Sequence, residues 1–292
     1  MNPGILAALG AYICWGLLPV YWKLLSHVPA PELLSHRIVW SFAALGLFLL
    51  ASKRLGALWR TLSPAIWRIY FWAAALVGVN WFIYVWSVNA GYIVEASLGY
   101  FITPLLSVFL GIFFFKERLR RLQWIPLFLA CSGVLYLTVS YGHLPWIALS
   151  LAITFSLYGM AKKKAPLGAF EGLTLETALL VPMALGWLVW NEYTGAGAFL
   201  HTSLRSDLLL MGAGIVTTLP LVMFAAATHR VPLSMIGMLQ YVAPTIQFLI
   251  GVCVYKEPFT SDQSVGFGLV WAAVLIFWLE RWIAGRGLRR LV

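Results

Sequence analysis

Charged residues are scarce in this sequence. Only 10% of its 292 residues are Asp, Glu, Lys or Arg, whereas 62% are hydrophobic. A soluble domain contains about 25% charged residues, so this chain has too few to cover a surface that faces water. The shortage excludes a soluble enzyme and a secreted disulfide-linked domain, and it indicates an integral membrane protein. The net charge of +10 is therefore expected in loops beside a membrane rather than on a nucleic-acid-binding surface.

Motifs that carry enzymatic chemistry are also missing. Cys14, Cys131 and Cys253 lie singly in apolar runs without CxxC or Cys/His spacing, so we interpret them as small buried hydrophobic residues. The sequence has no GxxxxGK[ST], HExxH or GxSxG motif. We therefore expect no enzymatic activity, no cofactor, no metal site and no nucleic-acid partner.

Long apolar runs are the main feature that is present. A helix that crosses the hydrocarbon core needs about 20 mostly apolar residues. Ten runs approach this length, and they predict an all-α membrane protein with ten transmembrane helices. The runs lie near 4–22, 33–51, 69–89, 95–115, 122–140, 145–161, 173–191, 207–228, 234–255 and 264–283.

Basic residues predict the orientation of these spans. With the N-terminus inside, 16 of the 20 Lys and Arg fall in cytoplasmic segments, among them the run Lys162, Lys163 and Lys164, which we interpret as a topology anchor. Three basic residues lie in outer segments, and Arg37 lies within a span. We therefore expect a multi-pass protein of the cell (inner) membrane with both termini in the cytoplasm.

The two halves of the chain resemble each other. A shift of 140 residues aligns five polar or conformationally special positions, namely Pro104 with Pro244, Gly111 with Gly251, Lys116 with Lys256, Glu117 with Glu257 and Gln123 with Gln263. A shift of 139 aligns Glu32 with Glu171 and Arg37 with Glu176. Because each half holds five spans, the second half must enter the membrane from the opposite side. The sequence thus predicts two inverted five-helix repeats, at 1–141 and 142–292.

Three stretches give this architecture a family resemblance. They are NWFIYVWSVNAG at 80–91, EASLGYF at 95–101 and YICWGLLPVYWK at 12–23. With the paired repeats of about 140 residues, they resemble the EamA family of the drug/metabolite transporter superfamily, and the RarD-like transporters in particular. The resemblance implies transport of small organic solutes.

Two functions from different classes are compatible with these features. The first is a secondary transporter that moves an amino acid, metabolite or drug by alternating access, driven by a proton, another ion or the solute gradient. Glu95, Glu176 and His36 are candidates for a proton-coupling group. The alternative is a lipid scramblase or a channel-like pore, with membrane lipid as the partner.

Charged residues inside the spans are the first candidates for the transport site, because an ionisable group in hydrocarbon usually faces a partner or a wet cavity. Arg37 lies in the outer part of the second span, and Glu95 begins the fourth span at a similar depth. We expect these two to pair and Arg37 to face a cavity. Glu176, from the cytoplasmic side, is a more distant candidate. The alternative for Arg37 is snorkelling to the outer headgroups.

Polar and aromatic residues at helical spacing, together with aromatic residues deep inside the spans, extend this candidate site. Those predicted to line a substrate cavity are Tyr12, Trp15, Asn80, Trp81, Tyr84, Tyr100, Gln240, Tyr241 and Gln247. The alternative for each polar member is a hydrogen bond between helices. Pro104 and Pro244 each remove a backbone hydrogen bond, and we expect hinges there. Trp22 lies near a span end and is expected to be an interfacial anchor.

Overall fold

The computed structural model describes residues 2–90, 92–140, 144–255 and 261–289, and over this part of the chain it contains helices and no strand. The longer helices are α1 (Pro3–Leu24), α2 (Ala30–Ala51), α4 (Pro64–Asn89), α5 (Ile93–Phe115), α6 (Trp124–Ser140), α7 (Trp146–Lys164), α8 (Ala169–Tyr193), α9 (Leu204–Thr228) and α12 (Ser261–Arg289). The shorter ones are α3 (Leu55–Thr61), η1 (Arg121–Gln123), α10 (Leu233–Gln240), α11 (Val242–Leu249) and the π-helical turn η2 (Ile250–Val254). The all-α class is as predicted.

Among the described residues, eight helical segments are long and apolar enough to cross a membrane. They coincide with eight of the ten predicted runs. The other two runs lie in α7, which ends in three lysines, and in α12, whose apolar stretch is the shorter segment Ser264–Glu280. Large apolar side chains such as Phe82, Phe128 and Val189 are about two-thirds exposed, as expected for surfaces that contact lipid.

Two local features depart from the predicted spans. The loop after α2 contains the short helix α3, which no long apolar run announces. The ninth run is interrupted at Tyr241, between α10 and α11. The proline ring of Pro244 has no N–H to donate to the carbonyl of Gln240, which explains a break at this point. Pro104, in contrast, leaves α5 continuous.

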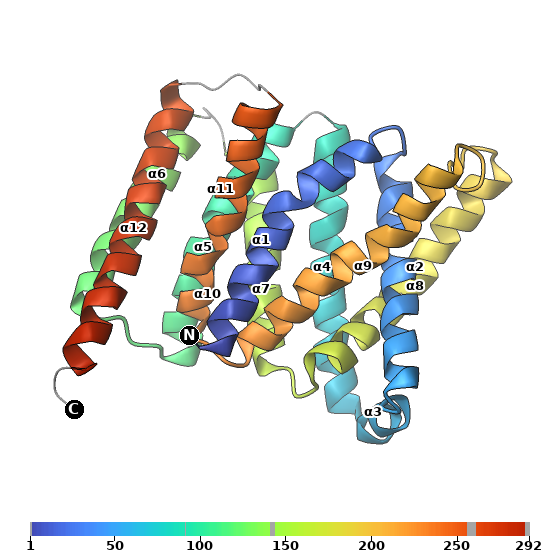
Figure 1. Ribbon diagram of the computed structural model, residues 1–292, viewed down its shortest axis with the longest axis horizontal. Coiled ribbons are helices and arrows are strands. Elements are labelled where there is room, and N and C mark those ends of the chain that lie inside the picture. The colour runs from blue at the N-terminus through green and yellow to red at the C-terminus, as the bar shows by residue number, and fades with distance from the viewer. Residues whose placement is uncertain (1, 91, 141–143, 256–260, 290–292) are drawn as a thin grey trace.

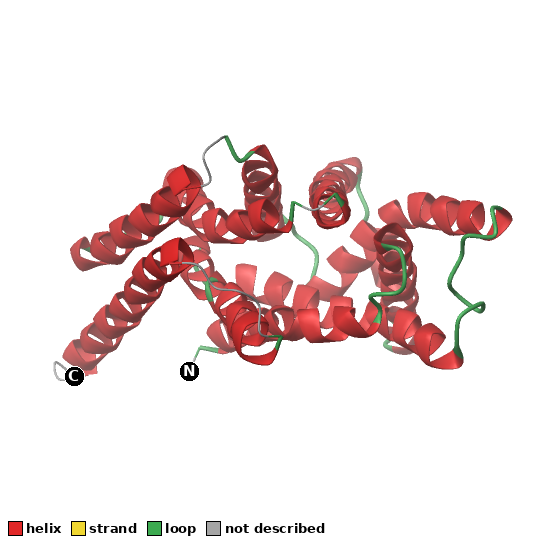
Figure 2. Cartoon of the chain, turned by 90° about the horizontal axis from the view of Figure 1, so that it is seen from above, coloured by secondary structure: helices red, strands yellow, loops and turns green. Residues whose placement is uncertain are grey.

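Most helices of the first half pack against helices of the second half. The main contacts join α1 to α9 and α11, α2 to α8 and α9, α4 to α7 and α8, and α5 to α7 and α10. The helices α6 and α12 pack on each other at one end of the elongated bundle (Figures 1 and 2). The chain enters α1 and leaves α12 on the same side of the bundle (Figure 1).

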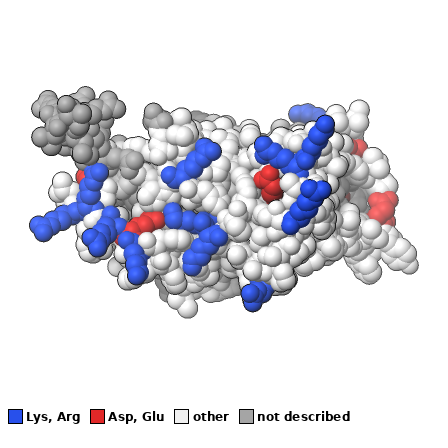
Figure 3. Space-filling view, turned by 90° about the horizontal axis from the view of Figure 1, so that it is seen from below, with Lys and Arg blue, Asp and Glu red and all other residues white. Residues whose placement is uncertain are grey.

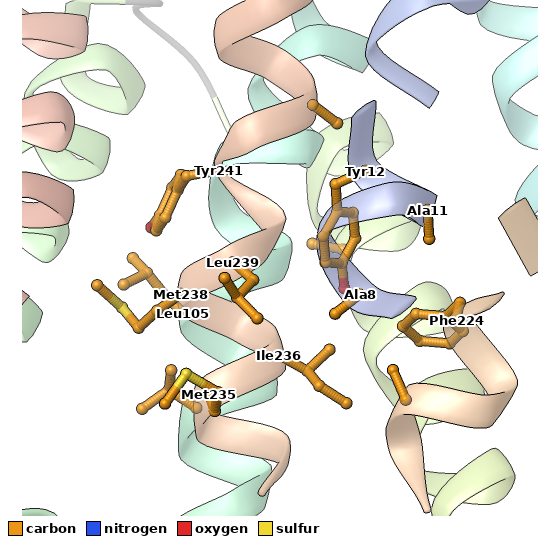
Figure 4. Packing of buried hydrophobic residues seen from close by; sticks show 14 of the residues in the cluster. Ala8, Ala11, Tyr12, Leu105, Phe224, Met235, Ile236, Met238, Leu239 and Tyr241 are labelled. Carbon is orange, nitrogen blue, oxygen red and sulfur yellow. The ribbon is translucent and has the colours of Figure 1, made fainter. Parts of the chain in front are cut away.

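The core is densely packed where α5 crosses α10. A Cβ atom on Gly237 would lie 2.6 Å from the carbonyl oxygen of Pro104, so only glycine permits this backbone approach. Met235, Ile236 and Leu239 surround the crossing and are nearly fully buried (Figure 4). This contact fixes α10, and with it one wall of the cavity described next, against the first half of the chain.

Candidate functional site

A cavity of about 110 Å³ lies between helices from both halves of the chain. It is much larger than the roughly 10–15 Å³ that one water molecule needs. Its walls come from α1, α2, α4, α5, α7, α9, α10 and α11. The structure brings nine of the twelve predicted cavity residues together here: Tyr12, Trp15, Arg37, Asn80, Trp81, Tyr84, Tyr100, Gln240 and Gln247.

Arg37 supplies the positive charge of the cavity. Its guanidinium carbon lies 4.8 Å from the ring centre of Trp22 and 5.1 Å from that of Trp81. Its Nε donates a hydrogen bond of 3.0 Å to the hydroxyl of Thr217. Two cation–π contacts and one hydroxyl therefore orient the group. The position of Trp22 corrects its interpretation as an anchor, because this indole lines the cavity beneath Arg37.

The neutral polar residues are held in place by bonds to the helices around them. Asn80 donates to the carbonyl oxygen of Leu151 and to the hydroxyl of Thr154, both at 2.9 Å. Gln247 donates to the carbonyl oxygen of Trp15 at 3.0 Å. Both amide side chains thus form hydrogen bonds between helices and also line the cavity. Cavity lining and interhelical hydrogen bonding, which the sequence offered as alternatives, are therefore compatible for these two residues.

An aromatic layer borders the cavity on one side, and three of its members, Tyr12, Trp15 and Phe155, line the cavity. We use this name for Tyr12, Trp15, Phe155, Tyr158 and Phe224. Phe224 contacts the other four rings, with centroid distances of 5.6–6.4 Å. Such distances are those of favourable aromatic pairs. Lys162, near the end of α7, and its ion-pair partner Glu176 lie beyond this layer.

Glu176 and Tyr241 lie away from the cavity lining, which corrects their assignment. The Oε1 of Glu176 is 2.6 Å from the Nζ of Lys162, and its Oε2 accepts a 2.9 Å bond from the hydroxyl of Tyr158. Tyr241 is 1% exposed, and its hydroxyl points to the carbonyl oxygen of Phe101 at 3.4 Å. Figure 4 shows its ring on the side of α10 away from Tyr12. Both residues are therefore satisfied by the protein itself.

The expected partner of Arg37 cannot be placed. The side chain of Glu95 lies outside the described residues, although its backbone belongs to α5. Of the two predicted hinges, Pro244 lines the cavity at the break after α10, whereas Pro104 packs against Gly237. No group of three or more His, Cys, Asp or Glu within the described part of the chain is placed to hold a metal ion.

Several lining residues were missed from the sequence, although the repeat contained a signal for some of them. Phe155 lies 140 positions after Trp15, and Leu221 lies 140 positions after Trp81. All four line the cavity, as do Tyr100 and its repeat counterpart Gln240. Applying the 140-residue shift to each predicted lining residue would have found Phe155 and Leu221. Thr217 has no comparable signal.

At the same side as the aromatic layer, Glu117 joins the two halves of the chain. Its carboxylate accepts hydrogen bonds from the backbone N–H of Leu233 at 2.7 Å and of Ser234 at 2.9 Å, at the start of α10. The Nζ of Lys163 is 3.5 Å away. Burial alone would raise the pKa of the Glu117 carboxyl, but these donors outweigh it and lower the pKa from its ordinary value of 4.5.

The chain is similar to known proteins over nearly its whole length. The sequence profile of the EamA-like transporter family matches residues 2–139. Protein RarD of Streptomyces exfoliatus is 46% identical over 98% of this chain and 90% of its own length. The transporter YojE of Bacillus subtilis is 45% identical over 94% and 93%. The chain belongs to the EamA-like transporter family. Within it, the chain is one of the RarD-like transporters, and it is not an enzyme.

Two further proteins match this chain over nearly their whole length and nearly all of its own. The chloramphenicol-sensitive protein RarD of Pseudomonas aeruginosa is 32% identical over 98% of this chain and 96% of its own. A solved crystal structure with 18% identity has the same fold, with a TM-score of 0.72 over 95% of this chain and 99% of that one. The fold described here is therefore shared by a solved structure of nearly the same length.

Proposed function

We propose that this EamA-family protein is a secondary carrier that moves a small organic solute, such as an amino acid, metabolite or drug, by alternating access. Ten spans form two inverted five-helix repeats, at 1–141 and 142–292, and the cavity between them is the solute site. The observation that carries the proposal is this cavity, which is lined by both halves and bordered on one side by the aromatic layer.

The pattern of helix packing supports the inverted repeat. Under the repeat, α1 corresponds to α7, α2 to α8, α4 to α9, and α5 to α10 with α11. If each helix is replaced by its counterpart, the α1–α9 contact becomes the α7–α4 contact, and both are present. In the same way the α5–α7 contact becomes the α11–α1 contact, and both of these are present too. Three further contacts, α2–α8, α5–α10 and α6–α12, join a helix directly to its own counterpart. A twofold relation between the halves accounts for all these contacts.

Matched contacts at the two ends of the bundle support alternating access. The Nζ of Lys163 lies 5.2 Å from the ring of Phe115, and the Nζ of Lys23 lies 5.1 Å from the ring of Tyr255. Each residue of the second contact is 140 positions from its counterpart in the first. Lys163 is half-buried, whereas Lys23 is exposed. The two contacts thus have the same length, but the lysine at one end is more buried than the lysine at the other, which fits a carrier whose two ends differ in access to water.

The closed side is the cytoplasmic one in this proposal. Lys and Arg gather on the face that holds the start of α1 and the end of α12 (Figure 3), and basic loops favour the cytoplasm. The protein therefore lies in the cell membrane with both termini inside. Because the aromatic layer and the Glu117–Lys163 contact lie toward that side, the conformation is outward-facing.

Counterflow in vesicles tests the carrier function. The full chain is reconstituted, the vesicles are loaded with amino acids or with chloramphenicol, and uptake of the labelled solute is followed. We expect saturable uptake that is accelerated by solute inside, because a carrier returns faster when loaded. Uptake that rises linearly with concentration without acceleration would indicate a pore, and exchange of labelled phospholipid between leaflets would indicate a scramblase.

A matched pair of glycine variants makes this assay specific. Gly237→Ala places a methyl group 2.6 Å from the Pro104 carbonyl at the α5–α10 crossing, so the movement of these helices should be impaired. Gly46→Ala adds the same group where nothing lies within 4 Å. Uptake should fall for the first variant and stay unchanged for the second, with equal amounts of inserted protein.

A further inference from the structure

The cation in the cavity has no anionic partner in the described protein. Of the described side chains, none of the carboxylates lies within 4.0 Å of the Arg37 guanidinium, whose only hydrogen bond goes to the neutral hydroxyl of Thr217. The lining residues described for the cavity include no Asp or Glu. Among the described lining residues, the charge of the cavity is therefore the single positive charge of Arg37.

A buried guanidinium without an anionic partner has an unfavourable desolvation free energy. Moving a charge out of water costs several kcal/mol even after relaxation, and cation–π contacts return about 2 kcal/mol when desolvated. The contacts with Trp22 and Trp81 thus hold the guanidinium without neutralising it. An anion that enters the cavity with the solute would complete the site.

The unused donors match a carboxylate. A guanidinium has five N–H groups, and the one on Nε is bonded to Thr217. The four on the two terminal nitrogens form the fork that binds a carboxylate through two parallel hydrogen bonds. A doubly charged phosphate would bring more negative charge than the single cation can balance. A singly charged carboxylate fits the charge of the cavity better.

The rest of the cavity selects the remainder of the solute. Trp15, Trp81, Tyr84, Tyr100 and Phe155 all line it. Flat aromatic walls favour a solute with an apolar or aromatic body. The amides of Gln240 and Gln247 offer neutral polar contacts beside these rings.

We propose, on the basis of the carrier function above, that the solute is an organic monocarboxylate whose carboxylate binds the terminal nitrogens of Arg37 and whose apolar body lies against the aromatic walls. Arg37 is then the residue that determines specificity for anions. Amines are excluded by charge repulsion, and neutral amides of the same shape lack the charge that completes the site.

Matched sets of small probes test this assignment. The purified full chain is titrated near neutral pH with phenylacetate, phenylacetamide and phenethylamine, and with indole-3-acetate, its amide and tryptamine, while the midpoint of thermal unfolding is recorded. We expect at least one acid to bind roughly tenfold or more tightly than its amide, with no binding of the amines. Arg37→Gln should remove the preference for the acid, and Arg37→Lys should keep part of it, because an ammonium retains the charge but not the fork.

Controls separate this proposal from general effects of charge and folding. Arg205→Gln removes one exposed cation away from the cavity lining and should leave the acid preference intact. Elution as a single species and a cooperative unfolding transition without probe establish that Arg37→Gln is folded. The proposal is overturned when no acid binds, when acid and amide bind alike, or when Arg37→Gln keeps the preference.

The same probes in counterflow distinguish the two proposals. Saturable exchange of amides and acids alike, unaffected by Arg37→Gln, would leave the carrier function standing and remove the anion specificity. Binding of the acid in detergent without any exchange in vesicles would leave the anion site standing and remove the carrier function. Chloramphenicol, which is neutral, serves as a third probe, and its preferential exchange would count against an anionic solute.

Discussion

Two intramembrane charges at matched places in the repeat have opposite environments. Arg37 lies seven residues after the start of α2, and Glu176 lies seven residues after the start of α8. Glu176 is 1% exposed and bonded to both Lys162 and Tyr158. Arg37 faces the cavity, and within the described part of the chain its hydrogen bond goes to Thr217. The second half thus neutralises its charge with its own side chains, whereas none of the described carboxylates neutralises the charge of Arg37.

Positions 139 residues apart in the sequence thus have different roles in packing: the charge of Glu176 ties neighbouring helices together, whereas the charge of Arg37 lies in the cavity wall. The Lys162–Glu176 pair lies behind the aromatic layer and ties α7 to α8. Arg37, between Trp22 and Trp81, lies in front of that layer. Substitutions on the two sides should therefore separate stability from transport.

The largest effect is expected when the internal pair is broken. Lys162→Met leaves the Glu176 carboxylate buried with only the Tyr158 hydroxyl as partner. Removing one member of a buried pair costs about 3–5 kcal/mol, and we expect this loss in denaturant-induced unfolding in micelles. The double variant Lys162→Met with Glu176→Leu should recover most of it. An equally unstable double variant would mean that the lysine stem, rather than the charge pair, stabilises the protein.

An intermediate effect is expected for a charge that lies outside the spans. Because the pKa of Glu117 is lowered on folding, its ionised form stabilises the protein fully above pH 4.5, and this contribution is lost as the pH falls through the lower folded value. Hydrogen bonds to a charged group contribute about 1.5–3 kcal/mol. Glu117→Gln should therefore lower the unfolding midpoint near neutral pH and reduce its dependence on pH in this acidic range.

A pH profile of the Glu117→Gln protein that retains the full slope below pH 4.5 would contradict this assignment. Another carboxylate would then dominate acid destabilisation. Either result refines the comparison, because it tells whether the α5–α10 contact depends on charge in the way that the Lys162–Glu176 pair does.

The smallest effect on stability is expected at Arg37. Arg37→Gln removes two cation–π contacts and one hydrogen bond, but it also removes a buried charge that no described carboxylate balances. These terms oppose each other, so the free energy of unfolding should change by no more than about 1 kcal/mol. A loss as large as that of Lys162→Met would show that Arg37 has a structural partner after all.

The sequence predicted the features that depend on hydrophobic length and helical spacing. Helices longer than the membrane is thick follow from apolar runs. Seven of the nine predicted lining residues followed from polar and aromatic residues that recur at three and four positions, because such residues share one face of a helix. Trp81 followed from its depth inside a span. Arg37 was predicted because a charged side chain inside an apolar run is costly to bury and usually faces a partner or a wet cavity.

Features that depend on how helices rotate and fold back were not predicted. Lys162 belongs to a lysine run that suggested a topology anchor, yet it is 1% exposed because α8 brings Glu176 against it. Neighbouring residues such as Gln240 and Tyr241 point about 100° apart on a helix, so only the rotation of α10 decides which one lines the cavity. That rotation is set by the glycine crossing with α5.

The interleaving of the two halves has a consequence for biosynthesis. Since α1, α2, α4 and α5 each find their main partners among α7 to α11, the helices that leave the ribosome first cannot complete their packing until the last ones have been inserted. Tertiary assembly must follow insertion rather than accompany it. A chain cut between α6 and α7 would therefore regain its structure only if both fragments were produced together in the same membrane.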